Sequence, residues 1–487
     1  MPRDSNGRWP DVVDVETITT VKPDGHGGVD KTKTRWPLNG ARMKEGVHFT
    51  GGVFAPTPAS VEIKIWFAIA AEGLARHGTP PGCMDISTAF LSTEVCQERG
   101  AVYANVPGAW WIAERSLSEI MVLRQEMLKL KAENYQLYKK ECGRWRRSYS
   151  EYVMRCNSRV YGDPSASKAF FAASAQHLMG ELEFKQNQVA PTIFTLHRPL
   201  QWFIAHSKVA SVQALFQKRL DEALAKYGRA AAEEEAALDR DQVTRGMPSM
   251  AKYEALRCEI TVIEHVDDYG VASCRAGQEW FNERMAERFD VGKFEPMQTF
   301  LGMQVIVNVK AATIRLNQKA LIEQTYYKFG QHCRDRGIIG CRIPAKPGMD
   351  LVEKVSSEEA EEYAGLPMAN IGGALSYLAQ WTRPEVINAA RQVSRHFFNF
   401  GKEQFEAALR CLAYLYETKT QGIAFCGRNV TFGTAKIWAN ADASFGLRCY
   451  AGIVVFLQGG PIANEFVKIC RRRPRQGRRK LSLKIRA

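Results

Sequence analysis

Residues 263–272 read IEHVDDYGVA and place two adjacent carboxylates, Asp267 and Asp268, between two short apolar runs. The runs favour strands and Asp favours turns, so the pattern predicts a strand, a tight turn and a second strand. Two neighbouring carboxylates repel each other, and a divalent cation with oxygen ligands would relieve that repulsion. An ordinary solvated turn has the same pattern, so a third carboxylate is needed to separate the two interpretations.

Asp85 is the candidate for that third carboxylate. It lies in residues 82–91, GCMDISTAFL, at the end of a short run that favours a strand. A carboxylate at a strand end could meet the Asp267–Asp268 turn in one cleft. The three residues together predict a site for a divalent metal.

Further blocks follow in a fixed order: VYANVPG at 102–108, TFLGM at 299–303, IRLNQK at 314–319, GALSYLA at 373–379 and TRP at 382–384. In this order, with the three carboxylates, they resemble the reverse transcriptase of copia-type retrotransposons, over most of residues 20–465. The resemblance implies an α+β fold of the right-hand polymerase kind, with fingers, palm and thumb, a helical connection and a truncated RNase H-like fragment.

The same resemblance divides the chain. The expected parts are fingers and first palm segment at 1–110, a helical insertion at 111–158, palm and fingers at 159–206, a helical insertion at 207–257, palm with the Asp-Asp hairpin and primer grip at 258–305, a thumb-like part at 306–350, a helical connection at 351–430, the RNase H-like fragment at 431–467 and a basic tail at 468–487.

The resemblance also implies an RNA-directed DNA polymerase that acts on an RNA template, a DNA primer and deoxynucleotide triphosphates. Asp85, Asp267 and Asp268 would hold two Mg²⁺ ions, or Mn²⁺ in their place. The other implied site residues are Lys33 and Arg35 on a basic hairpin that holds the triphosphate, Phe90 as the sugar gate, Ser165 beside the nucleotide, and Phe300, Leu301 and Gly302 in the primer grip. An exposed basic edge strand would also explain the hairpin, and core packing would explain Phe90, Phe300 and Tyr269.

Several positions depart from the family pattern. Ser165 replaces a glutamine that contacts the nucleotide, Pro37 replaces an apolar strand residue, and Glu264 replaces an apolar residue before the Asp pair. These changes and the two insertions leave an alternative open, in which the chain is an inactive retroelement-derived protein that binds nucleic acid.

The two insertions predict helices. Apolar residues recur in steps of three and four from Ile120 to Leu137, which favours self-association through residues 117–140 or packing of the helix on its own domain. Translated intron-like sequence is a further explanation of this insertion. The second insertion is rich in Ala and Glu at 230–238, which are strong helix formers.

The 487 residues carry a net charge of +14, which suggests a polyanionic partner such as nucleic acid. Residues 468–486 hold ten Lys or Arg and no acid, so the rest of the chain carries 14 − 10 = +4. This tail either binds phosphates without sequence preference or is a frame-shifted end. After Asp442, the first carboxylate of the RNase H-like fragment, only Glu465 remains, and this argues against RNase H activity.

The sequence holds no apolar run long enough to span a bilayer and no secretory signal core. Its twelve cysteines are scattered without zinc-ligand spacing. We therefore expect reduced thiols and an intracellular protein, in a cytoplasmic particle or the nucleus and not secreted.

Overall fold

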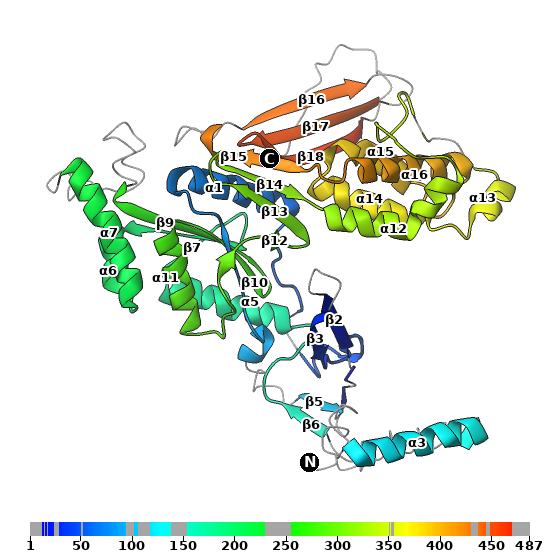
Figure 1. Ribbon diagram of the computed structural model, residues 1–487, viewed down its shortest axis with the longest axis horizontal. Helices are drawn as coiled ribbons and strands as arrows, with labels where there is room; N and C mark the ends of the chain where they lie inside the picture. The colour runs from blue at the N-terminus through cyan, green and yellow to red at the C-terminus, as the bar shows by residue number, and fades with distance from the viewer. Residues whose placement is uncertain are drawn as a thin grey trace.

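Figure 1 shows the computed structural model of the chain. The structure describes residues 12–13, 15–16, 18–23, 29–49, 52–93, 102–105, 117–137, 153–228, 255–349, 351, 355–429, 437–444 and 449–469. Within these ranges the chain combines helices with sheets whose strands are mainly antiparallel. The predicted helix 230–238 and most of the basic tail lie outside the described residues.

A six-stranded sheet forms the centre of the molecule, and we call it the central sheet. Its strands are β4 (Gly82–Asp85), β7 (Lys185–Gln186), β8 (Ile193–Pro199), β9 (Arg257–His265), β10 (Asp268–Ala272) and β11 (Glu295–Pro296). They lie in the order β11-β4-β10-β9-β8-β7, and every neighbouring pair is antiparallel. The predicted strand, turn and strand around the Asp pair are confirmed as β9 and β10.

Four helices cover one face of the central sheet: α5 (Ala166–Gln176), α6 (Leu200–His206), α7 (Ala210–Tyr227) and α11 (Arg275–Ala286). Alternate residues of β9, such as Ile260 and Val262, point into this core. The rings of Phe203 and Phe216 stack between α6 and α7 with their centres 4.8 Å apart. Helix α7 belongs to the second predicted insertion, and its apolar side packs onto the domain.

That insertion leaves the sheet intact. Strand β8 ends at Pro199 and β9 begins at Arg257, and these two residues lie directly opposite each other in the antiparallel pair. The chain between them therefore leaves the sheet and returns to the same place. The insertion therefore loops out without displacing β8 or β9, which a slowly growing loop-closure cost allows.

The other face of the central sheet rests on α1 (Ser60–His77). Apolar residues at helical spacing, including Trp66 and Leu74, are buried there, and Gly78 ends the helix with a φ of 65°. A second sheet lies on the same core: β12 (Thr299–Phe300), β13 (Met303–Asn308), β14 (Thr313–Asn317) and β15 (Ile423–Cys426).

A three-stranded meander also reaches this core: β16 (Trp438–Ser444), β17 (Cys449–Leu457) and β18 (Gly460–Ile469). Leu457 and Ile462 are buried with Phe425 of β15. The amide of Cys426 donates to the carbonyl of Gln458 at 2.9 Å. The segment expected as a separate RNase H-like fragment at 431–467 therefore shares its core with the central sheet.

The remaining helices form a second compact core, to the right in Figure 1: α12 (Lys319–Asp335), α13 (Ser357–Tyr363), α14 (Met368–Trp381), α15 (Ile387–Ser394) and α16 (Lys402–Glu417). Helices α13 to α16 lie within residues 351–430, the part expected as a helical connection, and α15 follows a 3-10 turn, η6 (Pro384–Val386). No helix among the described residues is long and apolar enough to cross a membrane.

The N-terminal part supplies two smaller sheets. Strands β2 (Ile18–Pro23) and β3 (Val29–Arg35) form the predicted basic hairpin, with Lys33 opposite Thr20 and Arg35 opposite Ile18. Strands β1 (Val12–Val13), β5 (Val102–Asn105) and β6 (Val153–Cys156) form the other. Strand β6 lies inside the segment predicted as a helical insertion at 111–158, and it pairs with β5.

Helix α3 (Leu117–Glu133) confirms the helical character of the first insertion. It extends from the region of β5 and β6 toward the lower right of Figure 1. Its side chains are described from Gln125 onward, and most of these are exposed. Leu128 is exposed outside the predicted seam, so the apolar residues of this helix do not lie on one covered stripe.

Candidate active site

The three predicted carboxylates meet at one end of β4 and β10. Asp85 is the last residue of β4 and lies directly opposite Asp268, the first residue of β10. Asp267 lies in the two-residue loop between β9 and β10, and its carbonyl accepts a hydrogen bond from the amide of Ile86 at 3.0 Å. Backbone pairing thus brings together residues that are more than 180 positions apart in sequence.

The turn that carries Asp267 contains a strained residue. Val266 has a φ of 59°, in the left-handed region that β-branched residues avoid. A two-residue loop between antiparallel strands favours a positive φ because its twist then matches that of the strands. The strain is therefore the cost of a tight turn that holds Asp267 next to Asp268.

The carboxylates influence one another electrostatically. The pKa of Asp268 is raised, first by partial burial and then by the negative charges of Asp267 and Asp85, while His265 lowers it. Asp85 and Asp268 are exposed and Asp267 is half-buried, so solvent and ions can reach them. A cation at this point would remove the repulsion that raises the pKa.

Among the described residues, no group of three or more His, Cys, Asp or Glu side chains is arranged to hold a metal ion. Mg²⁺, however, is commonly bound by one or two carboxylates together with water and substrate phosphates. Asp85, Asp267 and Asp268 offer the oxygen donors that this ion prefers. The chemistry of these donors is therefore compatible with Mg²⁺ when water or another ligand supplies its remaining oxygens.

Tyr161 is a site residue that sequence reasoning missed. Burial raises its pKa, the charges of Asp267 and Asp85 raise it further, and Arg35 lowers it. The guanidinium carbon of Arg35 lies 5.7 Å from the centre of the Tyr161 ring, in a cation–π contact. Tyr161 therefore lies between the basic hairpin and the carboxylates.

The hairpin is joined to Tyr161 by backbone contacts as well. The amide of Leu38 donates to the carbonyl of Tyr161 at 2.7 Å. Gly162 has a φ of 88°, and a Cβ there would come within 2.0 Å of the Leu38 carbonyl oxygen. Only glycine allows this close approach, which holds Arg35 beside the site.

Of the two predicted phosphate-binding residues, Arg35 reaches the site. Its Nε is buried and has no hydrogen-bond partner among the described residues, which leaves this donor for an anion. Lys33 lies on the same strand, and the side chain of Lys33 is outside what the structure describes.

Phe90, the predicted sugar gate, lies in the short 3-10 helix η2 (Ala89–Ser92) and is buried. Its ring meets that of Tyr161 edge-to-face, with the centres 4.9 Å apart. Phe90 belongs to the core and also touches a site residue, so both of its predicted roles remain compatible with its position.

Ser165 does not face an open cleft. Its hydroxyl donates to Oδ1 of Asp163 at 2.6 Å and accepts from Nη1 of Arg159, and Arg159 pairs with Asp163 at 2.9 Å. Asp163 also accepts from the Ser165 amide at 2.8 Å. These contacts occupy the hydroxyl at the start of α5, and they explain the serine at this position as part of a closed local network.

The predicted primer-grip residues form a tight hairpin turn. Leu301 and Gly302 link β12 to β13 and have φ values of 48° and 76°. The Phe300 side chain is buried and stacks on Trp66 with ring centres 6.2 Å apart. Phe300 thus has the buried position that core packing explains. Of the predicted primer-grip residues, only Leu301 and Gly302 in the turn are placed to touch a ligand.

Glu264 is fully buried on the helix-covered face of the central sheet. Burial raises its pKa to about 8, and hydrogen bonds from Ser174 and Tyr269 offset part of this rise. The Ser174 hydroxyl lies 3.0 Å from Glu264 Oε2 and 2.6 Å from the Tyr269 hydroxyl. Oε1 of Glu264 has no hydrogen-bond partner among the described residues. Tyr269 is buried in the same network, as core packing would place it.

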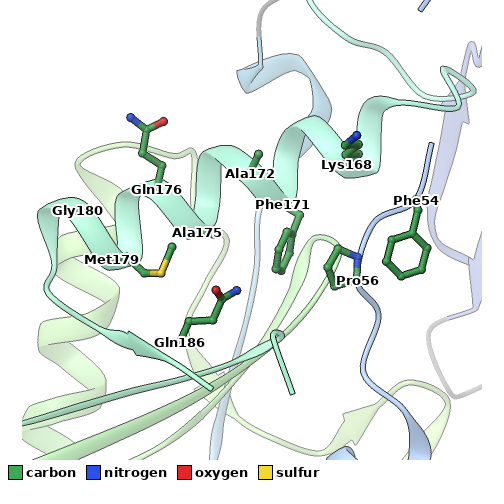
Figure 2. A pocket seen from close by; sticks show the side chains of 10 residues that line it. All are labelled: Phe54, Pro56, Lys168, Phe171, Ala172, Ala175, Gln176, Met179, Gly180 and Gln186. Atoms are coloured by element: carbon green, nitrogen blue, oxygen red, sulfur yellow. The ribbon is translucent and has the colours of Figure 1, made fainter. Parts of the chain in front are cut away.

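An apolar pocket of about 560 Å³ lies beside α5, lined by residues of that helix together with Gln186 of β7 and with Phe54 and Pro56. Figure 2 shows Phe171 and Pro56 next to each other in this pocket, with Phe54 beside them and Lys168 on the same helix. Phe54 is 78% exposed, which is unusual for a phenylalanine.

Asp442 lies on β16 opposite Gly452 of β17. The side chain of Asp442 is outside the described part of the chain, and so is that of Glu465. The prediction that Asp442 is a carboxylate of an RNase H remnant therefore stays a prediction.

Comparison with known proteins gives one partial match. No protein-family model matches the chain. A segment of 146 residues, 29% of the chain, is 28% identical to the retrovirus-related Pol polyprotein from transposon TNT 1-94 of Nicotiana tabacum. The matched segment spans 11% of the length of that polyprotein. Part of this chain is thus similar to a retrotransposon Pol polyprotein, which suggests that the protein derives from a retroelement.

Proposed function

We propose that this protein is an RNA-directed DNA polymerase of a copia-type retrotransposon, built as a right-hand polymerase around the central sheet. The observation that carries the proposal is the direct pairing of Asp85 with Asp268, next to Asp267 in the β9–β10 turn. The similarity to a retrotransposon Pol polyprotein supports the same class of activity.

In this proposal, the carboxylates hold two Mg²⁺ ions with the phosphates of an incoming deoxynucleotide triphosphate. When bound, such ions activate the primer 3′-hydroxyl and stabilise the charge on the leaving pyrophosphate. The protein positions the reactants: the strained turn at Val266 fixes Asp267, and pairing with β10 fixes Asp85.

Arg35 would neutralise the negative charge of the triphosphate from the side opposite the three carboxylates. Its buried Nε without a described partner is available to a phosphate oxygen, and the Tyr161 ring holds the guanidinium in place. The RNA template and DNA primer would then lie across the exposed ends of β4 and β10.

Primer extension tests the proposal. The purified chain is given an RNA template with an annealed DNA primer, deoxynucleotides and Mg²⁺. We expect extension by the parent and a loss of about 100-fold or more in Asp85→Asn and Asp267→Asn, since each removes a charge that stabilises the transition state by several kcal/mol. Glu295→Gln is the matched control, because it removes an exposed carboxylate from neighbouring strand β11 of the same sheet.

The control should keep full activity. A folded parent that binds primer-template but extends nothing, with Mg²⁺ or with Mn²⁺, would contradict the proposal.

A second candidate function is nucleic-acid binding without catalysis. Two observations favour it: the Ser165 hydroxyl is occupied by Asp163 and Arg159, and the described carboxylates are not arranged as a metal site. Binding to primer-template that is equal in the parent and in both aspartate variants, without extension in any of them, would support this function.

A further inference from the structure

Two cysteines that are 16 residues apart meet on the helix-covered side of the central sheet. Cys258 lies near the start of β9, and Cys274 lies directly before α11. Their sulfur atoms are 3.5 Å apart, and both side chains are buried. A disulfide needs a sulfur–sulfur distance of about 2.05 Å, so a closing movement of about 1.5 Å would join them.

The two thiols differ chemically. Cys274 is the N-cap of α11, and its sulfur accepts a hydrogen bond from the Gly277 amide at 3.4 Å. The hydrogen bond from Cys258 and the positive charge of Arg219 help lower the pKa of Cys274 to about 6, despite burial. The pKa of Cys258 is raised well above its usual value by the same hydrogen bond. The place of Cys274 at the helix N-terminus and the Gly277 amide therefore favour the thiolate on Cys274 over Cys258.

Arg219 comes from α7, which lies in the second insertion. Its Nε is buried and has no hydrogen-bond partner in the described part of the chain. Its charge acts on both thiols, lowering the pKa of each. An arginine and a helix N-terminus stabilise a thiolate, and a second thiol in contact can resolve a sulfenic acid formed on it; the two side chains are each 3% exposed.

We propose that Cys258 and Cys274 form a redox-active pair, which a peroxide converts to an intramolecular disulfide. The Cys274 thiolate attacks one peroxide oxygen, giving a sulfenic acid and hydroxide, which takes a proton from solvent to become water. The Cys258 thiol then attacks the sulfenic sulfur, the S–S bond forms and a second water leaves. In sum, two thiols and one hydrogen peroxide give one disulfide and two waters.

The bond would close the ring of residues 258–274, which contains the turn with Asp267 and Asp268. It would join the start of β9 to the start of α11. The thiol pair does not depend on polymerase activity, so this inference stands or falls separately from the proposed function.

Disulfide mapping of the parent chain tests the proposal. The folded protein is titrated with hydrogen peroxide, alkylated, digested without reduction and analysed by mass spectrometry. We expect a linked peptide pair containing Cys258 and Cys274, lighter by two hydrogens than its separate peptides and absent after reduction. It should form at peroxide doses that leave Cys83, Cys156 and Cys426 alkylatable, although these three are more exposed.

Variants identify the roles of the two sulfurs. Cys274→Ser should abolish the linkage, whereas Cys258→Ser should leave a sulfenic acid on Cys274 that dimedone traps. Cys411→Ser is the matched control, because Cys411 is a buried thiol whose pKa is raised to about 12, and it should leave the linkage unchanged. Arg219→Met should slow oxidation several-fold at pH 6, where the thiolate fraction is most sensitive.

The proposal is overturned if the parent oxidises in order of exposure, with Cys83, Cys156 and Cys426 modified first and the linked pair formed only after denaturation. This outcome is read from the parent alone, so it does not depend on whether any variant folds.

Discussion

Glu264 shows how a single residue can make the stability of this chain depend on pH. Its carboxyl has an ordinary pKa of 4.5 when unfolded and about 8 when buried. Between these values the folded chain keeps a proton that the unfolded chain releases, so the free energy of unfolding falls as pH rises. The slope is at most about 1.4 kcal/mol per pH unit, and below pH 4.5 the contribution is unchanged.

Glu264→Gln should remove this slope, because the amide is neutral at every pH. We expect the variant to match the parent at pH 5 and to be the more stable of the two at pH 8. Urea unfolding at several pH values measures the difference. Glu259→Gln makes the same change on the same strand and should keep the parental dependence of stability on pH. If Glu264→Gln also keeps that dependence, Glu264 is not its source.

At the residue scale, the sequence predicted the carboxylates and Arg35 because each one carries its chemistry in its identity. Tyr161 and the Cys258–Cys274 pair were missed for a physical reason. Their roles depend on neighbours that only the folded chain supplies, and Cys258 and Cys274 have no spacing that distinguishes them. The sequence marked Glu264 as a departure from the family pattern. Its hydrogen-bond partners, Ser174 and Tyr269, lie on helix α5 and strand β10, so the sequence alone does not reveal them.

Helix α7 of the second insertion is fixed by an acid on a neighbouring element. Glu283 of α11 accepts hydrogen bonds from the amides of Lys208 and Val209 at 2.5 and 3.0 Å, and from the Ser207 hydroxyl at 2.9 Å. A carboxylate at these amides satisfies donors that the helix itself leaves unpaired, and it interacts favourably with the helix dipole.

We therefore expect Glu283→Ala to lower the free energy of unfolding by about 1–2 kcal/mol. Glu279→Ala, one turn earlier on α11, removes only an exposed ion pair with Arg275 and should change it by less than about 0.5 kcal/mol. Urea denaturation measures the free energy of unfolding of both variants. If the two changes lower it equally, the hydrogen bonds accepted by Glu283 do not stabilise α7.

At the element scale, the spacing of apolar residues predicted the helices, and the alternation of apolar and polar residues predicted the hairpins. Each pattern arises because one face of the helix or strand is buried. Strand β6 was not foreseen in the segment expected to be helical at 111–158, since it is four residues long and its partner β5 lies about 50 residues earlier. Arg383 in the TRP block is 1% exposed and bonds Thr418 and Glu385, a packing role that periodicity cannot reveal.

At the scale of the whole molecule, the C-terminal meander acts as part of the core. Truncation after residue 429 removes Leu457 and Ile462 from the cluster around Phe425. Burying two such side chains contributes about 3–6 kcal/mol, so we expect a large fall in the thermal midpoint or loss of soluble protein.

Truncation after residue 469 keeps all three strands of the meander and serves as the control. Thermal unfolding followed by circular dichroism compares the two chains. If the shorter chain unfolds at the same temperature as the longer one, the meander is an independent unit.

Helix α1 lies where the central sheet, β14, β15 and β18 meet, and this position has a consequence for synthesis of the chain. Trp66 and Ile462 belong to one core but are 396 positions apart. A ribosome that adds about 5–20 residues per second needs about 20–80 s to make the intervening chain. During that time the apolar side of α1 lacks its final partners, so the nascent chain depends on whatever shields that side until its last strand emerges.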